Sequence, residues 1–325
     1  MSPLASADVA ASPAESAACD RTPVELALRS PHLDGDAEAV LDGARPRSEP
    51  MSIPYTYALH VPADLRDGDV PLLVAMHGLG GSGPQFADQS TWADLADELG
   101  FIVAFPTGAR RWDTTEGSPD VAFIRAVVAE IRAERCIDGR RIYATGHSYG
   151  GFMTQRLACD AGDLFAAGGV VSGGNVSTPG IGGPCDAGTG TGRLVTTPDG
   201  YEPVPLAFWH GTEDAIVRYE NGRASFDAWL ARYECEPPTT TAMPYGAAEE
   251  SGACHRGDIT SPRFAIRFRT YVDHAHGYPD GCGGLGAVSA TDCTEPDASR
   301  WPTAQSHNRE IIDFLFQHER TSPAP

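Results

Sequence analysis

The sequence predicts an α/β protein with a mostly parallel central sheet that helices cover on both faces. Short, continuous apolar runs recur along the chain, as expected of strands that are buried on both faces. Helix-like segments with one apolar face lie between these runs, and this alternation is typical of a parallel sheet. The length of 325 residues is sufficient for one large α/β domain.

The strand-like runs begin after the first 50 residues. They cover residues 55–61, 71–76, 101–105, 141–145, 167–172, 204–209 and 264–271. The helix expected over 92–99 has its apolar residues on one face and Gly100 in place to end it. Ser118-Pro119-Asp120 opens a second helix with a capping residue, a first-turn proline and an acid. Further helices are expected at residues 152–161, 221–232 and 305–318.

The chain divides into three parts. Residues 1–50 are rich in Ala, Ser, Pro and Asp, so we expect a loosely ordered N-terminal segment. Residues 51–320 form the predicted catalytic domain, and residues 321–325 form a tail. Within the domain, residues 173–203 are rich in Gly and Thr and lack periodicity. A loop of that length is usually functional, and we expect it to overhang the site.

The net charge limits the partners of this protein. The formal charge at pH 7 is −20, and so acidic a surface repels nucleic acid and anionic membranes. No apolar run approaches the roughly 20 residues that a membrane-spanning helix needs. We therefore expect neither nucleic acid nor membrane as a partner, and we expect a monomer.

Cysteine usage points to an oxidising compartment. The eight cysteines include no C-x-x-C pair, which favours disulfides over zinc. Residues 1–7 show neither the basic nor the apolar region of a secretory signal, so either the signal has been removed or the cysteines are free thiols in the cytosol. The number and spread of the cysteines favour a secreted protein whose signal has been removed. Cys136 and Cys159 both fall at the same end of the expected sheet, and we predict that they form a bridge. A Cys235–Cys254 bridge is the second prediction.

Gly146-His147-Ser148-Tyr149-Gly150 is a G-x-S-x-G motif in an informative position. A strand-like run leads into it and a helix-like run leaves it. A serine at such a strand-to-helix turn is held out above the sheet, and the small flanking residues allow the backbone to bend. Ser148 is therefore the candidate nucleophile, and the expected fold is that of the α/β-hydrolases.

A serine hydroxyl needs a base that takes its proton and an acid that orients the base. In α/β-hydrolases the acid and then the histidine follow the serine along the chain. Asp214 follows the run 204–209 and His276 follows the run 264–271, each in a loop beyond a strand end. Such loops collect catalytic groups in parallel sheets.

Each partner has an alternative. Glu213 competes with Asp214 as the acid, and His274 competes with His276 as the base. His210 is expected to order a turn. The His-x-His spacing of residues 274 and 276 is also that of a metal pair, but no third ligand with suitable spacing stands out, so we expect no metal.

The oxyanion of an acyl transfer needs hydrogen-bond donors. The residue after the nucleophile supplies one backbone N–H and the loop after an early strand supplies the other. These are predicted to be the N–H groups of Tyr149 and of Leu79, which lies in the segment Met76 to Gly81. Trp112 and Tyr278 are weaker candidates for the substrate pocket, and Trp112 could equally be part of the scaffold.

Several segments together resemble the secreted esterases of carbohydrate esterase family 1, which include feruloyl esterases and LpqC-like polyhydroxybutyrate depolymerases. The resemblance covers about residues 55–318, and it rests on His77-Gly78-Leu79-Gly80-Gly81, Arg141 to Gly151, His210 to Asp214 and His276-Gly277-Tyr278-Pro279. The family usually has x-W-P after its histidine, which selects His276 over His274. Tyr278 stands here in place of that tryptophan.

The resemblance implies a serine hydrolase that cleaves carboxylic esters, either small or polymeric, and that needs no cofactor. Hydroxycinnamoyl and hydroxyalkanoate esters are the expected substrates. Residues 148–154 also resemble a serine peptidase of the prolyl-oligopeptidase type, which is the alternative. A hydrolase fold that only binds partners is the remaining reading, although such proteins generally lose the serine or the histidine.

Overall fold

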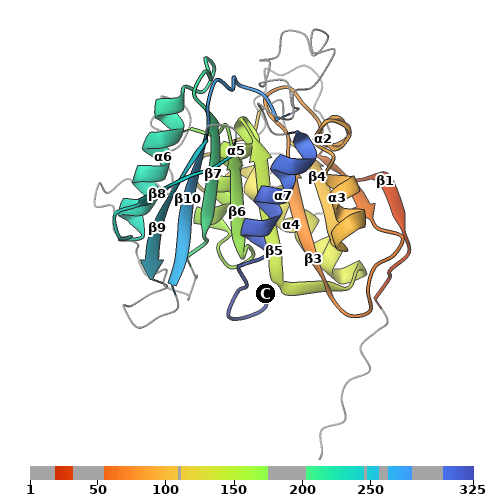
Figure 1. Ribbon diagram of the computed structural model, residues 1–325. Coiled ribbons are helices and arrows are strands. Elements are labelled where there is room, and N and C mark those ends of the chain that lie inside the picture. The colour runs from red at the N-terminus through yellow and green to blue at the C-terminus, as the bar shows by residue number, and fades with distance from the viewer. Residues whose placement is uncertain are drawn as a thin grey trace, which may run out of the picture.

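The computed structural model describes residues 19–31, 55–108, 111–174, 203–244, 247–255, 263–279 and 303–325. Within these residues the chain builds one ten-stranded sheet with the strand order β1-β2-β4-β3-β5-β6-β7-β10-β9-β8 (Figure 1). Its strands are β1 (Val24–Arg29), β2 (Thr56–Val61), β3 (Val70–Met76), β4 (Ile102–Thr107), β5 (Ile137–His147), β6 (Ala167–Val171), β7 (Leu206–Gly211), β8 (Thr239–Ala242), β9 (Ala248–His255) and β10 (Arg263–Tyr271).

The centre of the sheet is parallel. Strands β4, β3, β5, β6, β7 and β10 are parallel neighbours in that order, while β1 and β2 on one side and β8 and β9 on the other are antiparallel. β3, β4, β6 and β7 are buried throughout, which explains why their sequences read as unbroken apolar runs. The predicted mostly parallel sheet is confirmed.

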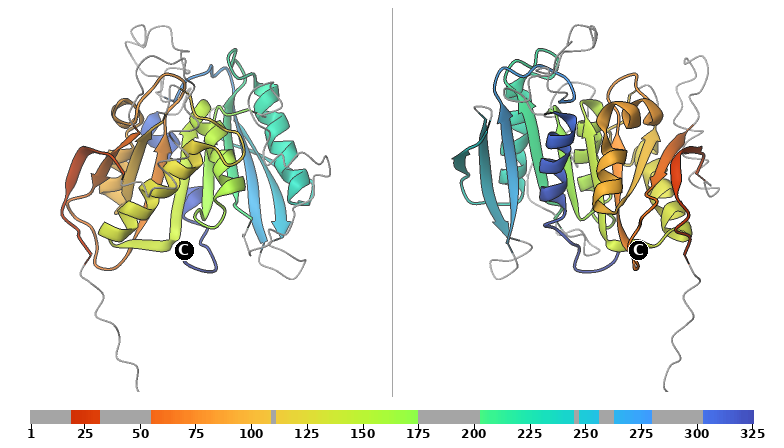
Figure 2. Two further views of the ribbon diagram at one scale, coloured as in Figure 1. Left: turned by 180° about the vertical axis from the view of Figure 1, so that it is seen from behind. Right: turned by 45° about the vertical axis from the view of Figure 1, so that its right-hand side comes forward.

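Helices cover both faces of the sheet. Side chains of α4, α5 and α6 join one buried apolar cluster, and side chains of α2, α3 and α7 join a second cluster on the other face (Figures 1 and 2). The helices are α2 (Gly83–Ser90), α3 (Trp92–Leu99), α4 (Pro119–Glu134), α5 (Tyr149–Asp160), α6 (Tyr219–Arg232) and α7 (Ala304–Leu315). The predicted caps are present. Ser118 accepts from Val121 N–H at the start of α4, and Gly100 ends α3 with a φ of 76°.

The two ends of the chain are bound more closely than predicted. Part of the N-terminal segment, expected to be loosely ordered, forms the edge strand β1 and pairs with β2. The expected tail also contacts the domain, because Ala324 N–H donates to the carbonyl of Gly139 at 2.8 Å. β1, β8 and β9 lie outside the apolar centre of the sheet, so their sequences lack the pattern that revealed the other strands.

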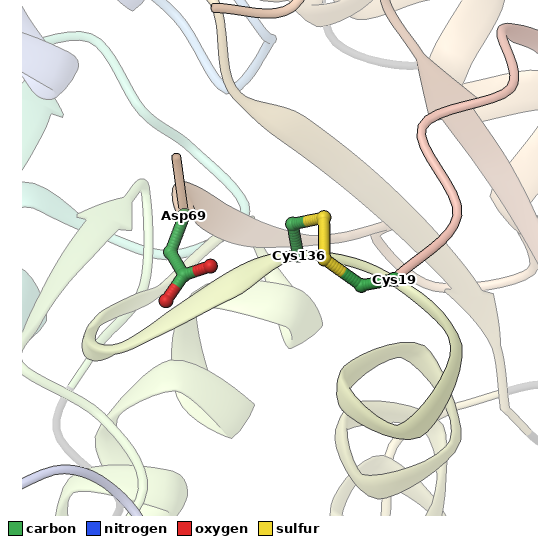
Figure 3. Close-up of side chains that lie close together, drawn as sticks. All are labelled: Cys19, Asp69 and Cys136. Atoms are coloured by element: carbon green, nitrogen blue, oxygen red, sulfur yellow. A yellow bond between two sulfur atoms is a disulfide. The ribbon is translucent and has the colours of Figure 1, made fainter. Parts of the chain in front are cut away.

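One of the two disulfide predictions is wrong. Cys136 is bonded to Cys19, not to Cys159, and Cys159 is itself disulfide-bonded. The Cys19–Cys136 bond attaches the segment before β1 to the residue just before β5 (Figure 3). Asp20, next to Cys19, forms a bridge with Arg135, and its N–H donates to the carbonyl of Glu134 at 2.9 Å. The predicted Cys235–Cys254 bond is confirmed. It joins the segment after α6 to β9.

Asp69 lies beside the first of these bonds. The carboxylate and the sulfurs of Cys19 and Cys136 lie within 4.8 Å of one another, a spacing that could hold a metal ion (Figure 3). Both sulfurs are consumed in the disulfide, so neither offers the thiolate that binds metal. In the described part of the chain, no helix is both long and apolar enough to cross a membrane. Most of the predicted 173–203 loop lies outside the described residues.

Candidate active site

Ser148 occupies the turn between β5 and α5. Its φ of 55° is positive, a conformation that costs a residue with a side chain free energy and that clusters at active sites. Two glycines allow this turn. A Cβ on Gly146 would lie 2.4 Å from the carbonyl carbon of Gly150, and a Cβ on Gly150 would lie 2.2 Å from the carbonyl oxygen of Met76. The spacing of the motif therefore follows from backbone contacts that exclude any side chain.

The structure brings Ser148, His276 and Asp214 together at the carboxyl ends of the strands. His276 Nε2 lies 2.9 Å from Ser148 Oγ, and His276 Nδ1 lies 2.7 Å from Asp214 Oδ2. The loops after β7 and β10 supply Asp214 and His276, and these two strands are parallel neighbours. All three side chains are buried. This is the hydrogen-bonded arrangement of a nucleophile, a base and an acid that orients the base.

Asp214 is held as a carboxylate by three hydrogen-bond donors and by the Nε2–H of His210, which it shares with the carbonyl of Val217. Oδ1 accepts the backbone N–H groups of Ile216 and Val217 at 3.0 and 2.8 Å. Oδ2 contacts His276, and it lies 3.2 Å from His210 Nε2. Burial alone would raise the pKa of Asp214, but the hydrogen bonds from His210 and His276 outweigh it and hold the pKa well below its usual value. The acid is therefore ionised wherever the site could operate.

The alternatives occupy other positions. Glu213 is exposed, and its backbone N–H donates to the carbonyl of His274 at 3.0 Å. His274 lies in the same loop as His276 and is buried, but its Nδ1 lies 2.9 Å from the carbonyl of Ala275 and does not contact Asp214. His210 donates from Nε2 to the carbonyl of Val217 at 2.7 Å and so orders the turn around Asp214, as expected.

His147 is the second histidine of the site. Its ring lies 5.0 Å from that of His276, measured between centroids. Burial, together with the neighbouring His276, lowers the pKa of His147 to about 3. The ring is therefore neutral at ordinary pH and places no positive charge next to the base.

The predicted oxyanion donors belong to two segments next to Ser148, the start of α5 and the loop after β3. Tyr149 is the first residue of α5, so its backbone N–H has no partner inside the helix. Gly78, next to Leu79, packs against the nucleophile, since a Cβ at Gly78 would lie 3.4 Å from Ser148 Cβ. The loop after β3 is therefore close enough to the serine to contribute a donor.

The two candidate pocket residues make contacts inside the protein, Trp112 fully buried and Tyr278 half-buried. Trp112 is 1% exposed, and its Nε1–H donates to the carbonyl of His77 at 2.9 Å. Tyr278 donates its hydroxyl to Asn308, and burial raises its pKa well above the usual value. Its ring packs edge-on against Phe86, with 5.3 Å between centroids. An aromatic residue near a predicted site is as readily a support as a contact surface, and the sequence offers no means to separate the two.

Two supporting residues were not predicted as such. Asp120 accepts Asp113 N–H at 2.6 Å and Tyr55 O–H at 2.8 Å, and Asn308 donates to the carbonyl of Ser90. The sequence marked Asp120 as a first-turn acid of its helix and as the start of a segment, Asp120 to Ile124, that is similar to one in the esterase family, but not as a support for a loop. Its contact with Asp113, seven residues earlier, depends on a loop that returns to the start of α4.

Comparisons with known proteins find esterases similar to this chain. Residues 55–179 match the protein family described as Esterase PHB depolymerase. Feruloyl esterase C of Emericella nidulans is 30% identical over 191 residues, which make up 58% of this chain and 62% of that protein. The bifunctional acetylxylan esterase/xylanase XynS20E of Neocallimastix patriciarum is 27% identical over 199 residues, 60% of this chain and 26% of that protein. The predicted family resemblance is confirmed.

The chain spans less than two thirds of the length of these two relatives. The crystal structure of an acetyl xylan esterase from Aspergillus awamori superposes with a TM-score of 0.53 and 21% identity, covering 68% of this chain and 89% of that one. At this identity the likeness concerns the fold alone, and it confirms the α/β-hydrolase fold.

Proposed function

We propose that this protein is a serine hydrolase that cleaves carboxylic esters through an acyl-enzyme. The proposal is carried by one observation, the continuous hydrogen bonding from Ser148 through His276 to Asp214. The similarity to feruloyl and acetylxylan esterases supports the ester as the bond that is cleaved.

The hydrogen bonds of the three residues support the following path for the proton. His276 donates from Nδ1 to the ionised Asp214, which leaves the Nε2 lone pair free to accept the hydroxyl proton of Ser148. Ser148 Oγ attacks the ester carbonyl as this proton moves to Nε2, and Asp214 stabilises the imidazolium that forms. The N–H groups of Leu79 and Tyr149 hold the oxyanion. The imidazolium then protonates the leaving alkoxide, and water repeats the sequence to release the acid.

Feruloyl or other hydroxycinnamoyl esters and polyhydroxyalkanoate-type polyesters are the proposed substrates. The net charge of −20 disfavours polyanionic substrates, so neutral esters fit best. The disulfides Cys19–Cys136 and Cys235–Cys254 support an oxidising compartment, and secretion as a monomer is part of the proposal. No cofactor takes part in these steps.

A substrate panel tests the proposal. We expect kcat/KM to be far higher for nitrophenyl butyrate and methyl ferulate than for a matched peptide anilide, because an amine needs better-placed proton delivery than an alkoxide. Polyhydroxybutyrate in the same panel tests the polymeric class. Ser148→Ala serves as the background control. A preference for the anilide would assign the site to a serine peptidase, and equal rates for wild type and Ser148→Ala would remove the site from the chemistry.

A further inference from the structure

Three consecutive residues connect the two sides of the nucleophile. Trp112, Asp113 and Thr114, called here the 112–114 bridge, each make one hydrogen bond to a different element. Trp112 contacts the loop after β3, Asp113 contacts the start of α4, and Thr114 contacts α5. The bridge therefore spans from the loop that carries Leu79 to the helix that begins at Tyr149.

The first contact fixes a peptide group of the loop after β3. The indole N–H of Trp112 donates to the carbonyl of His77 at 2.9 Å. Because a peptide unit is planar and trans, the direction of this carbonyl sets the direction of the Gly78 N–H. Gly108 allows the ring to lie here, since a Cβ at Gly108 would be 2.4 Å from Trp112.

The next peptide group is fixed by the ring of His77. Nδ1 of His77 lies 2.7 Å from the carbonyl of Gly78. Because a carbonyl oxygen can only accept a hydrogen bond, Nδ1 must carry the proton. The ring of Trp112 packs against the His77 ring with 4.9 Å between centroids. Trp112 thus holds the ring that directs the Gly78 carbonyl, and the opposite end of that peptide unit is the N–H of Leu79.

The other two contacts anchor the bridge. Asp113 N–H donates to Asp120 Oδ2 at 2.6 Å, and Thr114 accepts from Arg156 Nε at 2.7 Å. Arg156 is buried on α5, where it also pairs with Asp160 at 3.1 Å. Trp112 is therefore attached to the same helix whose first N–H is the second oxyanion donor.

We propose that Trp112 is a positioning residue that sets the direction of the Leu79 N–H relative to Ser148. The inference rests on the proposed function, because a donor at this place matters only if an oxyanion forms there. The indole N–H of Trp112 holds the His77–Gly78 peptide unit. The indole ring packs against the ring of His77, which directs the Gly78–Leu79 peptide unit. Oxyanion donors act mainly on the transition state, so a misdirected donor lowers kcat and leaves substrate binding in place.

Two equivalent tryptophans provide the test. Trp112→Phe keeps an aromatic ring and removes the N–H. Trp229→Phe is the matched control, because Trp229 is equally buried and its Nε1–H donates over the same 2.9 Å to Gln155, away from the loop after β3. In Trp112→Phe we expect kcat for nitrophenyl butyrate to fall about tenfold or more, while KM stays within about twofold of the wild-type value. This loss is smaller than the roughly 10²- to 10³-fold loss of kcat that follows removal of a whole oxyanion donor. Trp229→Phe should keep kcat within about twofold.

A transition-state analogue separates positioning from general destabilisation. The inhibition constant of an alkyl boronic acid should rise in Trp112→Phe by the same factor by which kcat/KM falls, and should not change in Trp229→Phe. Thermal unfolding of both variants measures the stability that each loses. Equal losses of kcat in both variants, or an unchanged boronate constant in Trp112→Phe, would overturn the inference.

A second variant approaches the same loop from the other side. In Gly81→Ala the new Cβ would lie 3.1 Å from His77 Cβ and would press on the ring that holds the Gly78 carbonyl. We expect the same loss of kcat at constant KM, and unchanged kinetics would count against the inference even if Trp112→Phe fails to fold. A wild-type protein that turns over no ester contradicts the proposed function, whereas an active wild type with an equally active Trp112→Phe contradicts only this inference.

Discussion

The two sides of Ser148 are built on different physical principles. On the base side, formed by Asp214, His210 and His276, one buried carboxylate gathers two imidazoles and two backbone N–H groups. On the oxyanion side, formed by the His77–Leu79 loop and Trp112, neutral hydrogen bonds and ring packing fix the backbone. Activity should therefore be most sensitive to the removal of charged groups on the base side, and to changes in side-chain packing and hydrogen bonding on the oxyanion side.

The largest effect is expected on the base side. Ser148→Ala, His276→Ala and Asp214→Asn should each lower kcat by roughly 10⁴-fold or more while the fold stays intact, because the three groups act as a unit. The double variant Ser148→Ala/His276→Ala should be hardly slower than Ser148→Ala alone. Steady-state kinetics with circular dichroism measures both quantities.

His274→Asn is the control for this prediction. His274 lies in the same loop and is equally buried, but its Nδ1 faces the carbonyl of Ala275 and not Asp214. We expect it to keep most of the wild-type kcat. Turnover near the wild-type value in His276→Ala, with activity lost in His274→Asn, would exchange the roles of the two histidines.

The next effect concerns stability near the oxyanion side, where Asp120 is the buried charge. Burial raises the pKa of Asp120 to about 6, although its hydrogen bonds from Asp113 and Tyr55 oppose this. The folded protein therefore takes up a proton more readily than the unfolded chain, and ionisation of Asp120 costs stability as pH rises from about 4 to about 6. The cost reaches about 3 kcal/mol above that range, at 1.36 kcal/mol per pKa unit.

Asp120→Asn measures this cost. Asn can accept the N–H of Asp113 and donate to the hydroxyl of Tyr55, so both contacts survive without a titrating group. The free energy of unfolding of the variant relative to wild type should rise between pH 4 and pH 7 in urea titrations. A difference that is constant over this range would show that Asp120 does not titrate there, and a falling difference would reverse the sign of the pKa shift.

The smallest effect separates the two histidines that contact Asp214. His210→Phe should lower kcat about tenfold, because Asp214 keeps its bond to His276 but loses the neighbour that helps to hold it ionised and orders the turn at Val217. KM should change little. Tyr219→Phe is the matched control, since its ring packs on His210 but its hydroxyl is bonded to Thr270. A loss of kcat in Tyr219→Phe as large as in His210→Phe would assign the effect to packing.

The base side could be predicted from the sequence because its signals are local. Asp214 and His276 each follow a buried strand directly, and parallel strands deliver their carboxyl ends to one edge of the sheet. The choice between His276 and His274, however, came from the family pattern, since two histidines in one loop differ only in the direction of their side chains.

The oxyanion side and the disulfides show where sequence reasoning stops. Trp112 was predicted to line a pocket, but whether an indole faces a ligand or the interior depends on how the loop after β4 folds back over the sheet. The predicted Cys136–Cys159 bond satisfied a spacing argument, but a bridge between Asp20 and Arg135 places Cys19 beside Cys136, and no local pattern in the sequence announces that contact. The Cys235–Cys254 pair is separated by only 19 residues, so proximity along the chain was sufficient there.

The described bridges have a consequence for how the chain matures. Cys19 and Cys136 follow one another in the order of cysteines along the chain, and so do Cys235 and Cys254. If the chain enters an oxidising compartment with its N-terminus first, both cysteines of each pair have entered before any later cysteine does. Both bonds can therefore form in the order in which the cysteines enter. A reduced, full-length chain presents all eight thiols at once, with about 105 complete pairings. Its oxidative renaturation should therefore depend on slow thiol exchange.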